Sequence, residues 1–259
     1  MLKPKQKTLK AIRPNVGVEV AYRTALIDIL SDMQADLLIG LRTELTPRTM
    51  AQDMSVPTFL KEFFGQWSNK WRKNIEAISP KLIEKFVGQS VEHTDQAFKS
   101  ALKKAGFTVN FKMTEKVSEN VQATIGENVS LINSWANGYF DEIQQDVWES
   151  IRVGHDLQTL TENLQNRYGI AKRKADFIAR DQNNKAKATI EKTRRLELGI
   201  TQAIWQHSHA GRKPRPSHVK ADGKTFDIEK GMYLDGKWVQ PAEEYNCRCT
   251  SRAIIEGFI

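Results

Sequence analysis

Apolar residues recur every three or four positions through long stretches of the first 200 residues of this 259-residue chain. This spacing is the period of an α-helix that turns one face toward a core. Ser79-Pro80 is typical of a helix start, and Tyr168-Gly169 is typical of a helix end. We therefore expect separate helices over about residues 18–42, 55–78, 80–104, 114–154, 156–168 and 171–198, with a short strand over 107–112.

The composition changes at Thr201, where Gly, Pro, His and short apolar runs replace the long periodic stretches. Ala203–Trp205 and Lys237–Val239 have the composition of short strands. Asp235-Gly236 is a favourable two-residue hairpin turn between Met232–Leu234 and the second of these strands. We therefore expect at least one β-hairpin in this part of the chain.

Together these patterns predict an α+β chain, with a mainly α-helical N-terminal region followed by a small C-terminal domain with β-hairpins. The first 13 residues carry five Lys and Arg and no acid, with little apolar content. We expect a basic flexible tail over residues 1–16, a helical domain over 17–200 and a C-terminal domain over 201–259.

A second basic segment lies in the last expected long helix, where residues 171–195 hold nine Lys and Arg against three acids. Four of these cations are spaced seven apart, which is nearly two helical turns: Arg173, Arg180, Lys187 and Arg194. Such a stripe suits non-specific binding to the phosphates of double-stranded DNA. It equally suits an acidic protein surface or a solvated helix face, and the spacing leaves these alternatives open.

The two cysteines of the chain, Cys247 and Cys249, are separated by one residue, and histidines precede them. Thiolates and imidazoles are the ligands that zinc prefers, and structural zinc sites take four ligands. His218, Cys247 and Cys249 supply three, and His209 or His207 would supply the fourth. A small loop-rich domain would gain stability from such an ion. Alternatively, the thiols are small buried apolar groups and His218 bonds a backbone group.

A hydrolytic centre is a third interpretation of the same residues. His218 would act as a base, Asp222 would orient it, and Asn246 or Arg248 would stabilise an oxyanion. However, the sequence has no pair of acids with a two-metal spacing and no Gly-rich phosphate loop. We therefore do not expect an enzyme, and a nuclease or DNA-binding protein is kept as the alternative function.

Ten C-terminal residues carry a resemblance to a known family. The chain resembles the phage Mu F-like minor head proteins, also called phage head morphogenesis proteins. The pattern runs from a Trp through Arg-x-x-His, Asp-Gly and Pro to a closing Asn-Cys-Arg-Cys. Its residues in this chain are Trp205, Arg215, His218, Asp222, Gly223, Pro241, Asn246, Cys247, Arg248 and Cys249.

The resemblance implies a minor head protein of a tailed phage or prophage, acting in head morphogenesis at the portal vertex. Expected partners are the phage portal protein and capsid subunits, with packaged double-stranded DNA as a further one. The expected location is the phage head, after synthesis in the bacterial host cytoplasm. No segment approaches the about 18 apolar residues of a membrane span, and no apolar stretch of a secretory leader follows the N-terminal lysines. We therefore expect no membrane partner.

Overall fold

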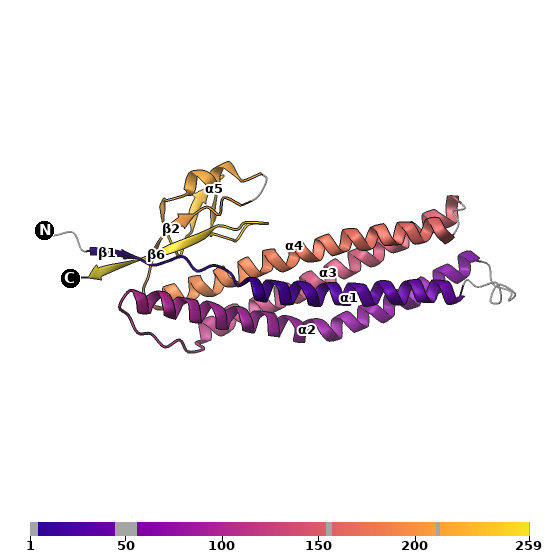
Figure 1. Ribbon diagram of the computed structural model, residues 1–259, viewed down its shortest axis with the longest axis horizontal. Helices are drawn as coiled ribbons and strands as arrows, with labels where there is room; N and C mark the ends of the chain where they lie inside the picture. The colour runs from indigo at the N-terminus through magenta and orange to yellow at the C-terminus, as the bar shows by residue number, and fades with distance from the viewer. Residues whose placement is uncertain (1–4, 45–55, 154–156, 211–212, 259) are drawn as a thin grey trace. The chain divides into compact units, whose positions relative to one another are not determined.

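The computed structural model describes residues 5–44, 56–153, 157–210 and 213–258. The expected α+β class is confirmed, because long helices precede small antiparallel sheets (Figure 1). The long helices are α1 (Val16–Glu44), α2 (Val56–Lys104), α3 (Glu115–Val153) and α4 (Leu157–Glu197). Among the described helices, none combines the length and the apolar composition that crossing a bilayer requires.

Helices α2 and α4 are each continuous where we expected two helices. Pro80 lies inside α2 and Gly169 lies inside α4. An internal proline removes one helical hydrogen bond and costs about 3 kcal/mol, and an internal glycine costs about 1 kcal/mol. Ile75 and Ile83 on either side of Pro80 are buried. Burial of two such side chains contributes about 3–6 kcal/mol, so packing outweighs the local signal.

Packing divides the chain into two compact units, each drawn from distant parts of the sequence. The mixed unit comprises Met1–Val20, Lys85–Ile125 and Ala179–Ile259, and the helical unit comprises Ala21–Glu84 and Gly126–Ile178. This division differs from the expected boundary at residue 200. The reason is that each long helix contributes one end to each unit, so the end of α4 packs together with the C-terminal strands.

The mixed unit contains a four-stranded antiparallel sheet in the order β1-β6-β2-β3. Its strands are β1 (Lys5–Thr8), β6 (Thr250–Phe258), β2 (Gln202–Gln206) and β3 (Thr225–Asp227). The expected hairpin is present as β4 (Met232–Leu234) and β5 (Lys237–Val239), joined by Asp235 and Gly236, both with positive φ. A short helix, α5 (Pro216–Ala221), lies between β2 and β3 in the sequence. The segment 107–112, expected to be a strand, has no regular secondary structure.

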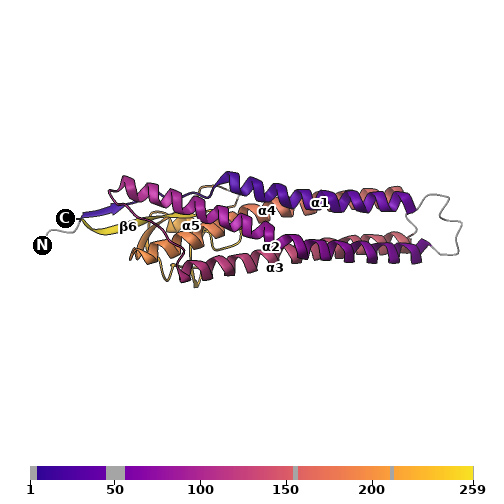
Figure 2. The same cartoon turned by 90° about the horizontal axis from the view of Figure 1, so that it is seen from below.

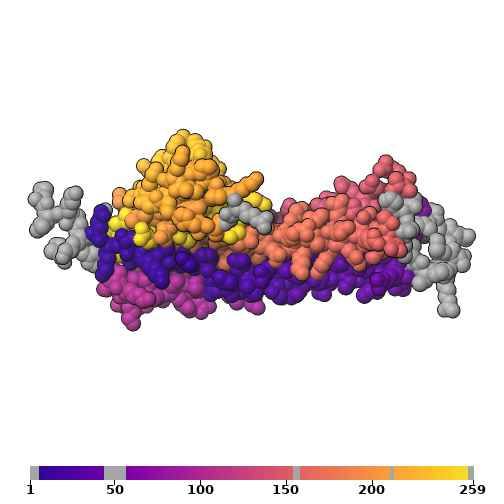
Figure 3. Space-filling view, turned by 45° about the horizontal axis from the view of Figure 1, so that its top comes forward, coloured from indigo at the N-terminus to yellow at the C-terminus, as the bar shows by residue number. Residues whose placement is uncertain are grey.

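The N-terminal segment differs from the expected flexible tail. Strand β1 pairs with β6, so the two ends of the described chain lie side by side (Figures 1 and 2). Leu9 and Ile12 are buried in one cluster with Ala203 and Trp205 of β2. The indigo N-terminal residues lie against the orange and yellow C-terminal ones in the space-filling view (Figure 3). In β1 the basic Lys5 and Lys7 alternate with the polar Gln6 and Thr8, so the local sequence shows no apolar pattern, and the edge of the sheet supplies the pairing partner.

The helical unit has its own core, built from apolar side chains of four helices. Leu30 of α1 is fully buried, and Trp67 of α2 meets Phe140 of α3 edge to face at 5.3 Å. The hydroxyl of Tyr139 donates to Oε1 of Gln34 at 2.6 Å. This packing makes the unit an all-helical scaffold that is separate from the chemistry-bearing residues.

Candidate metal centre

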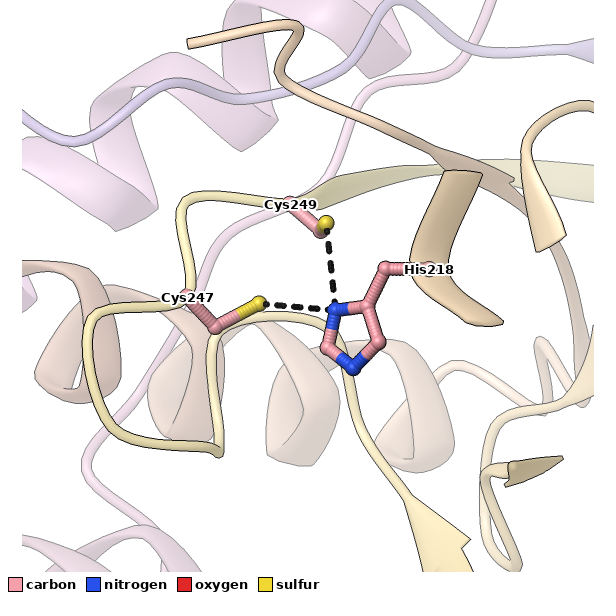
Figure 4. Close-up of side chains that lie close together, drawn as sticks. All are labelled: His218, Cys247 and Cys249. Atoms are coloured by element: carbon pink, nitrogen blue, oxygen red, sulfur yellow. Dashed lines mark hydrogen bonds between the residues drawn. The ribbon is translucent and has the colours of Figure 1, made fainter. Parts of the chain in front are cut away.

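Three of the expected metal ligands converge in the mixed unit. Nδ1 of His218 lies 3.6 Å from Sγ of Cys247 and 3.7 Å from Sγ of Cys249 (Figure 4). The ligand atoms of all three residues lie within 4.8 Å of one another. Each of these side chains is at most 3% exposed. A buried imidazole facing two thiols is a donor set suited to zinc.

Each ligand residue is positioned by the secondary structure around it. His218 is the third residue of α5, which begins at Pro216, a favourable first helical residue. The ring of His218 packs edge to face on Trp205 of β2, at 5.2 Å between ring centroids. Trp205 is fully buried. Cys249 directly precedes β6, whose Thr250 pairs with Gln206 of β2, so the sheet brings the thiol segment to the helix.

The cysteines follow a tight turn that needs a special backbone conformation. Asn246 has φ +57°, in the left-handed region that Asn tolerates better than most residues. Its N–H donates to Oδ1 of Asp181 in α4 at 2.6 Å, and the N–H of Cys247 donates to the carbonyl of Glu244 at 2.9 Å. The backbone N–H groups of Asn246 and Cys247 therefore hold this turn in place.

Glu244 is a site residue that sequence reasoning missed. Its Oε2 accepts from Nε2 of His218 at 2.9 Å and lies 3.3 Å from Nε of Arg215, while Oε1 lies 2.6 Å from Nζ of Lys237. The hydrogen bond from Lys237 holds the pKa of Glu244 below its usual value against the effect of burial, and Arg215 and His218 act in the same direction. The sequence feature that could have pointed to Glu244 is its position three residues before Cys247.

The two thiols share a proton. The side-chain hydrogen bond from Cys249, helped by backbone N–H groups, lowers the pKa of Cys247 to about 5. The same shared proton and burial raise the pKa of Cys249. The hydrogen bond between the thiols therefore favours ionisation of one of them, and metal binding requires both to be deprotonated.

A cavity of about 570 Å³ opens beside the three ligands. His218, Cys247 and Cys249 all contribute to its wall. Basic side chains also line it, from Lys213, Arg215 and Arg248. The cavity therefore joins the buried sulfur and nitrogen atoms to a positively charged space.

His209, our expected fourth ligand, is not part of the three-residue cluster. Its side chain is 70% exposed, and its Nε2 lies 3.3 Å from Oδ2 of Asp222. Asp222 also accepts the backbone N–H of His207 at 2.9 Å, which lowers the pKa of Asp222. The nuclease interpretation paired His218 with Asp222, whereas Nε2 of His218 faces Glu244. The acid that orients the imidazole comes from the loop before the cysteines.

The other motif residues build the frame of the site. Gly223 has φ +78°, and its N–H donates to the carbonyl of Trp205 at 2.9 Å. The N–H of Trp205 in turn donates to the carbonyl of Lys224 at 2.8 Å. Pro241 is buried in the turn after β5, and Arg248 is half-buried at the cavity wall. These contacts fix the end of α5 to β2.

The four spaced cations of α4 do not form one exposed stripe. They differ in exposure: Arg173 is exposed, Arg180 is half-buried, and Lys187 and Arg194 are buried. The guanidinium of Arg194 bonds both carboxylate oxygens of Asp95, at 2.9 and 2.7 Å. Nζ of Lys187 lies 2.9 Å from Oε2 of Glu191. The C-terminal end of α4 packs inside the mixed unit, where Asp95 and Glu191 neutralise the charges of Arg194 and Lys187.

Comparison with known proteins identifies this region. Residues 141–252 match the family model described as Phage Mu protein F like protein. That range contains all ten motif residues from Trp205 to Cys249. Over these residues the chain is similar to the phage Mu F-like family. The Mu F-like region includes the three clustered ligands, the cavity beside them and the whole of α4.

A curated protein is also similar to this chain. An uncharacterized protein of Haemophilus influenzae is 28% identical to this chain over 141 residues. The alignment covers 54% of this chain but 31% of the Haemophilus protein, so the chain spans less than a third of that relative's length. No solved structure matches the chain at a significant level.

Proposed function

We propose that the protein is a minor head component of a tailed phage or prophage, and that it acts in head morphogenesis. The observation that carries this proposal is the match of residues 141–252 to the phage Mu F-like family. On this proposal the protein is a structural component that resides in the phage head and does not turn over a substrate.

The partners follow from the same proposal. A minor head protein meets capsid subunits and the portal protein at the vertex where DNA enters. The long helices supply extended surface for such contacts, because α1 to α4 each span at least 29 residues. We propose the portal protein and the capsid subunits as the direct partners.

Fractionation of particles tests this assignment. Cells carrying the phage or prophage would be induced, and procapsids, mature heads and free protein would be separated and probed for this chain. We expect it in procapsids or heads, with chemical cross-links from its helices to portal or capsid subunits. Absence from both particle fractions, together with normal heads when the gene is deleted, would contradict the proposal.

Contact with packaged double-stranded DNA is a finer part of the proposal. It rests on the exposed Lys172 and Arg173 and no longer on the four-residue stripe. Such binding would be non-specific and would weaken steeply with salt. We expect Arg173→Ala to lower the salt dependence of duplex binding by about one counterion. The control is Lys81→Ala, which removes an exposed cation of α2 and should change the salt dependence less. Equal effects of the two substitutions, or no binding at low salt, would remove DNA from the partners.

A further inference from the structure

The two nitrogen–sulfur distances among the three clustered ligands match those between ligands of a tetrahedral zinc ion. Zinc binds sulfur at about 2.3 Å and nitrogen at about 2.0–2.1 Å, which places N and S ligands about 3.6 Å apart at tetrahedral angles. The two measured nitrogen–sulfur distances are 3.6 and 3.7 Å. We propose that His218, Cys247 and Cys249 hold one zinc ion, whose fourth position opens into the adjoining cavity. This proposal is independent of the role in head assembly.

The equal distances argue for a metal and against a cysteine–histidine nucleophile. A catalytic dyad needs one sulfur within reach of the imidazole, whereas here Nδ1 of His218 faces both Cys247 and Cys249 (Figure 4). Two sulfurs and one nitrogen around a common point are the arrangement that a shared ion requires. All three side chains are also buried, so the protein already excludes water from three sides of that point.

Glu244 completes the arrangement from the far side of the imidazole. Nε2 of His218 donates to Oε2 of Glu244 at 2.9 Å, which leaves the lone pair of Nδ1 directed at the sulfurs. A carboxylate behind a metal-binding histidine fixes its tautomer and raises its basicity. Lys237 and Arg215 hold the same carboxylate, so Glu244 is a positioning residue and not a ligand.

The described residues supply three ligands in this cluster, and the fourth position faces the cavity. The candidate ligand set there comprises His218, Cys247 and Cys249. His209 is turned to Asp222 at the surface. The cavity of about 570 Å³ is lined by all three ligand residues. Zinc sites with three protein ligands take water or an exogenous group in the fourth position, and Lys213, Arg215 and Arg248 favour an anion there.

Zinc analysis of the full chain tests the assignment. The protein would be purified without chelator, its zinc content measured, and its zinc X-ray absorption spectrum recorded. We expect about one zinc per chain, with two sulfur neighbours at about 2.3 Å and nitrogen or oxygen neighbours at about 2.0–2.1 Å. A folded full-length chain that takes up no zinc at micromolar free zinc would overturn the proposal.

Variants test which residues bind the ion. We expect Cys249→Ser and His218→Ala to weaken zinc binding at least about 100-fold, and Glu244→Gln to weaken it about 10–100-fold. The matched control is His209→Ala, which should bind zinc as the wild type does. If the ligand variants fail to fold, zinc can be titrated into chelator-treated wild type before and after alkylation of its thiols. We expect alkylation to abolish zinc binding. Loss of zinc in His209→Ala would contradict the three-ligand assignment.

The fourth position has a test of its own. Cobalt(II) substituted for zinc gives a visible spectrum that reports its ligands, and azide is a small anion that would enter from the cavity. We expect azide to change this spectrum in the wild type, and to act more weakly in Arg248→Gln. An unchanged spectrum at saturating azide would show that the fourth position is closed.

Discussion

Nε2 of His218 lies 2.9 Å from Oε2 of Glu244, although 26 residues separate the two in the sequence. This contact joins α5 to the loop that leads into Cys247 and Cys249. It fixes the orientation of the imidazole before any metal binds. Around His218, the mixed unit is therefore held together by the Glu244 carboxylate as well as by its apolar core.

Glu244→Gln should lower the stability of the metal-free protein. Glu244 accepts from His218 and Lys237 and forms an ion pair with Arg215, and the neutral amide keeps the shape but loses these charge-assisted interactions. We expect a loss of about 1–3 kcal/mol in the free energy of unfolding, measured by urea unfolding in the presence of chelator. Glu229→Gln, at an exposed site, is the control, and equal losses for both variants would refute this role.

Arg194→Ala and Arg173→Ala should differ strongly, although both remove one cation from α4. Arg194 is 2% exposed and bonds both oxygens of Asp95, so its removal leaves a carboxylate without its partner. We expect a loss of about 3–5 kcal/mol for Arg194→Ala and less than about 0.5 kcal/mol for Arg173→Ala. Urea unfolding followed by circular dichroism measures both, and similar midpoints would disagree with the described burial.

Asp36 should make the stability of the helical unit depend on pH. Burial acts to raise the pKa of Asp36, but hydrogen bonds from Lys70 and Trp71 at 2.8–2.9 Å outweigh it and hold the pKa below its usual 3.8. Because the pKa is lower in the folded state, the ionised group stabilises the fold above about pH 4, and this contribution disappears as pH falls through the folded pKa.

The variant Asp36→Asn measures this contribution. We expect it to be less stable than the wild type at pH 7, and the difference in urea midpoint to shrink below pH 4. Asp32→Asn changes an exposed carboxylate on the same helix and should show no such convergence. A constant difference for Asp36→Asn at every pH would argue against the ionised hydrogen-bonded carboxylate.

Asn246 should tolerate glycine better than a β-branched residue. Its φ of +57° lies in the left-handed region, where a branched side chain costs about 1–2 kcal/mol. The N–H that reaches Asp181 is retained in any variant except proline. We expect Asn246→Gly to keep wild-type stability and Asn246→Val to lose about 1–2 kcal/mol. Thermal unfolding compares them, and indistinguishable melting temperatures would show that the turn adapts.

Local signals in the sequence determined much of the secondary structure. The three-to-four residue rhythm predicted the long helices, including one from about residue 114, and Oγ1 of Thr114 accepts the N–H of Val117 at 3.3 Å at the start of α3. Asp235-Gly236 predicted the β4–β5 hairpin. These features depend on residues a few positions apart, so the chain encodes them locally. The order of the motif residues likewise pointed to the phage Mu F-like family.

Tertiary structure decided the features that depend on residues far apart. Pro80 and Gly169 stayed inside helices because buried neighbours outweigh their local cost. Glu244 took the place beside His218 that we had given to Asp222, since the loop before β6 folds back onto α5. Lys187 and Arg194 became buried because the end of α4 packs inside the mixed unit. Periodicity shows which residues lie on one face of a helix, but not which part of the chain covers that face. The covering segment is determined by packing across the whole chain.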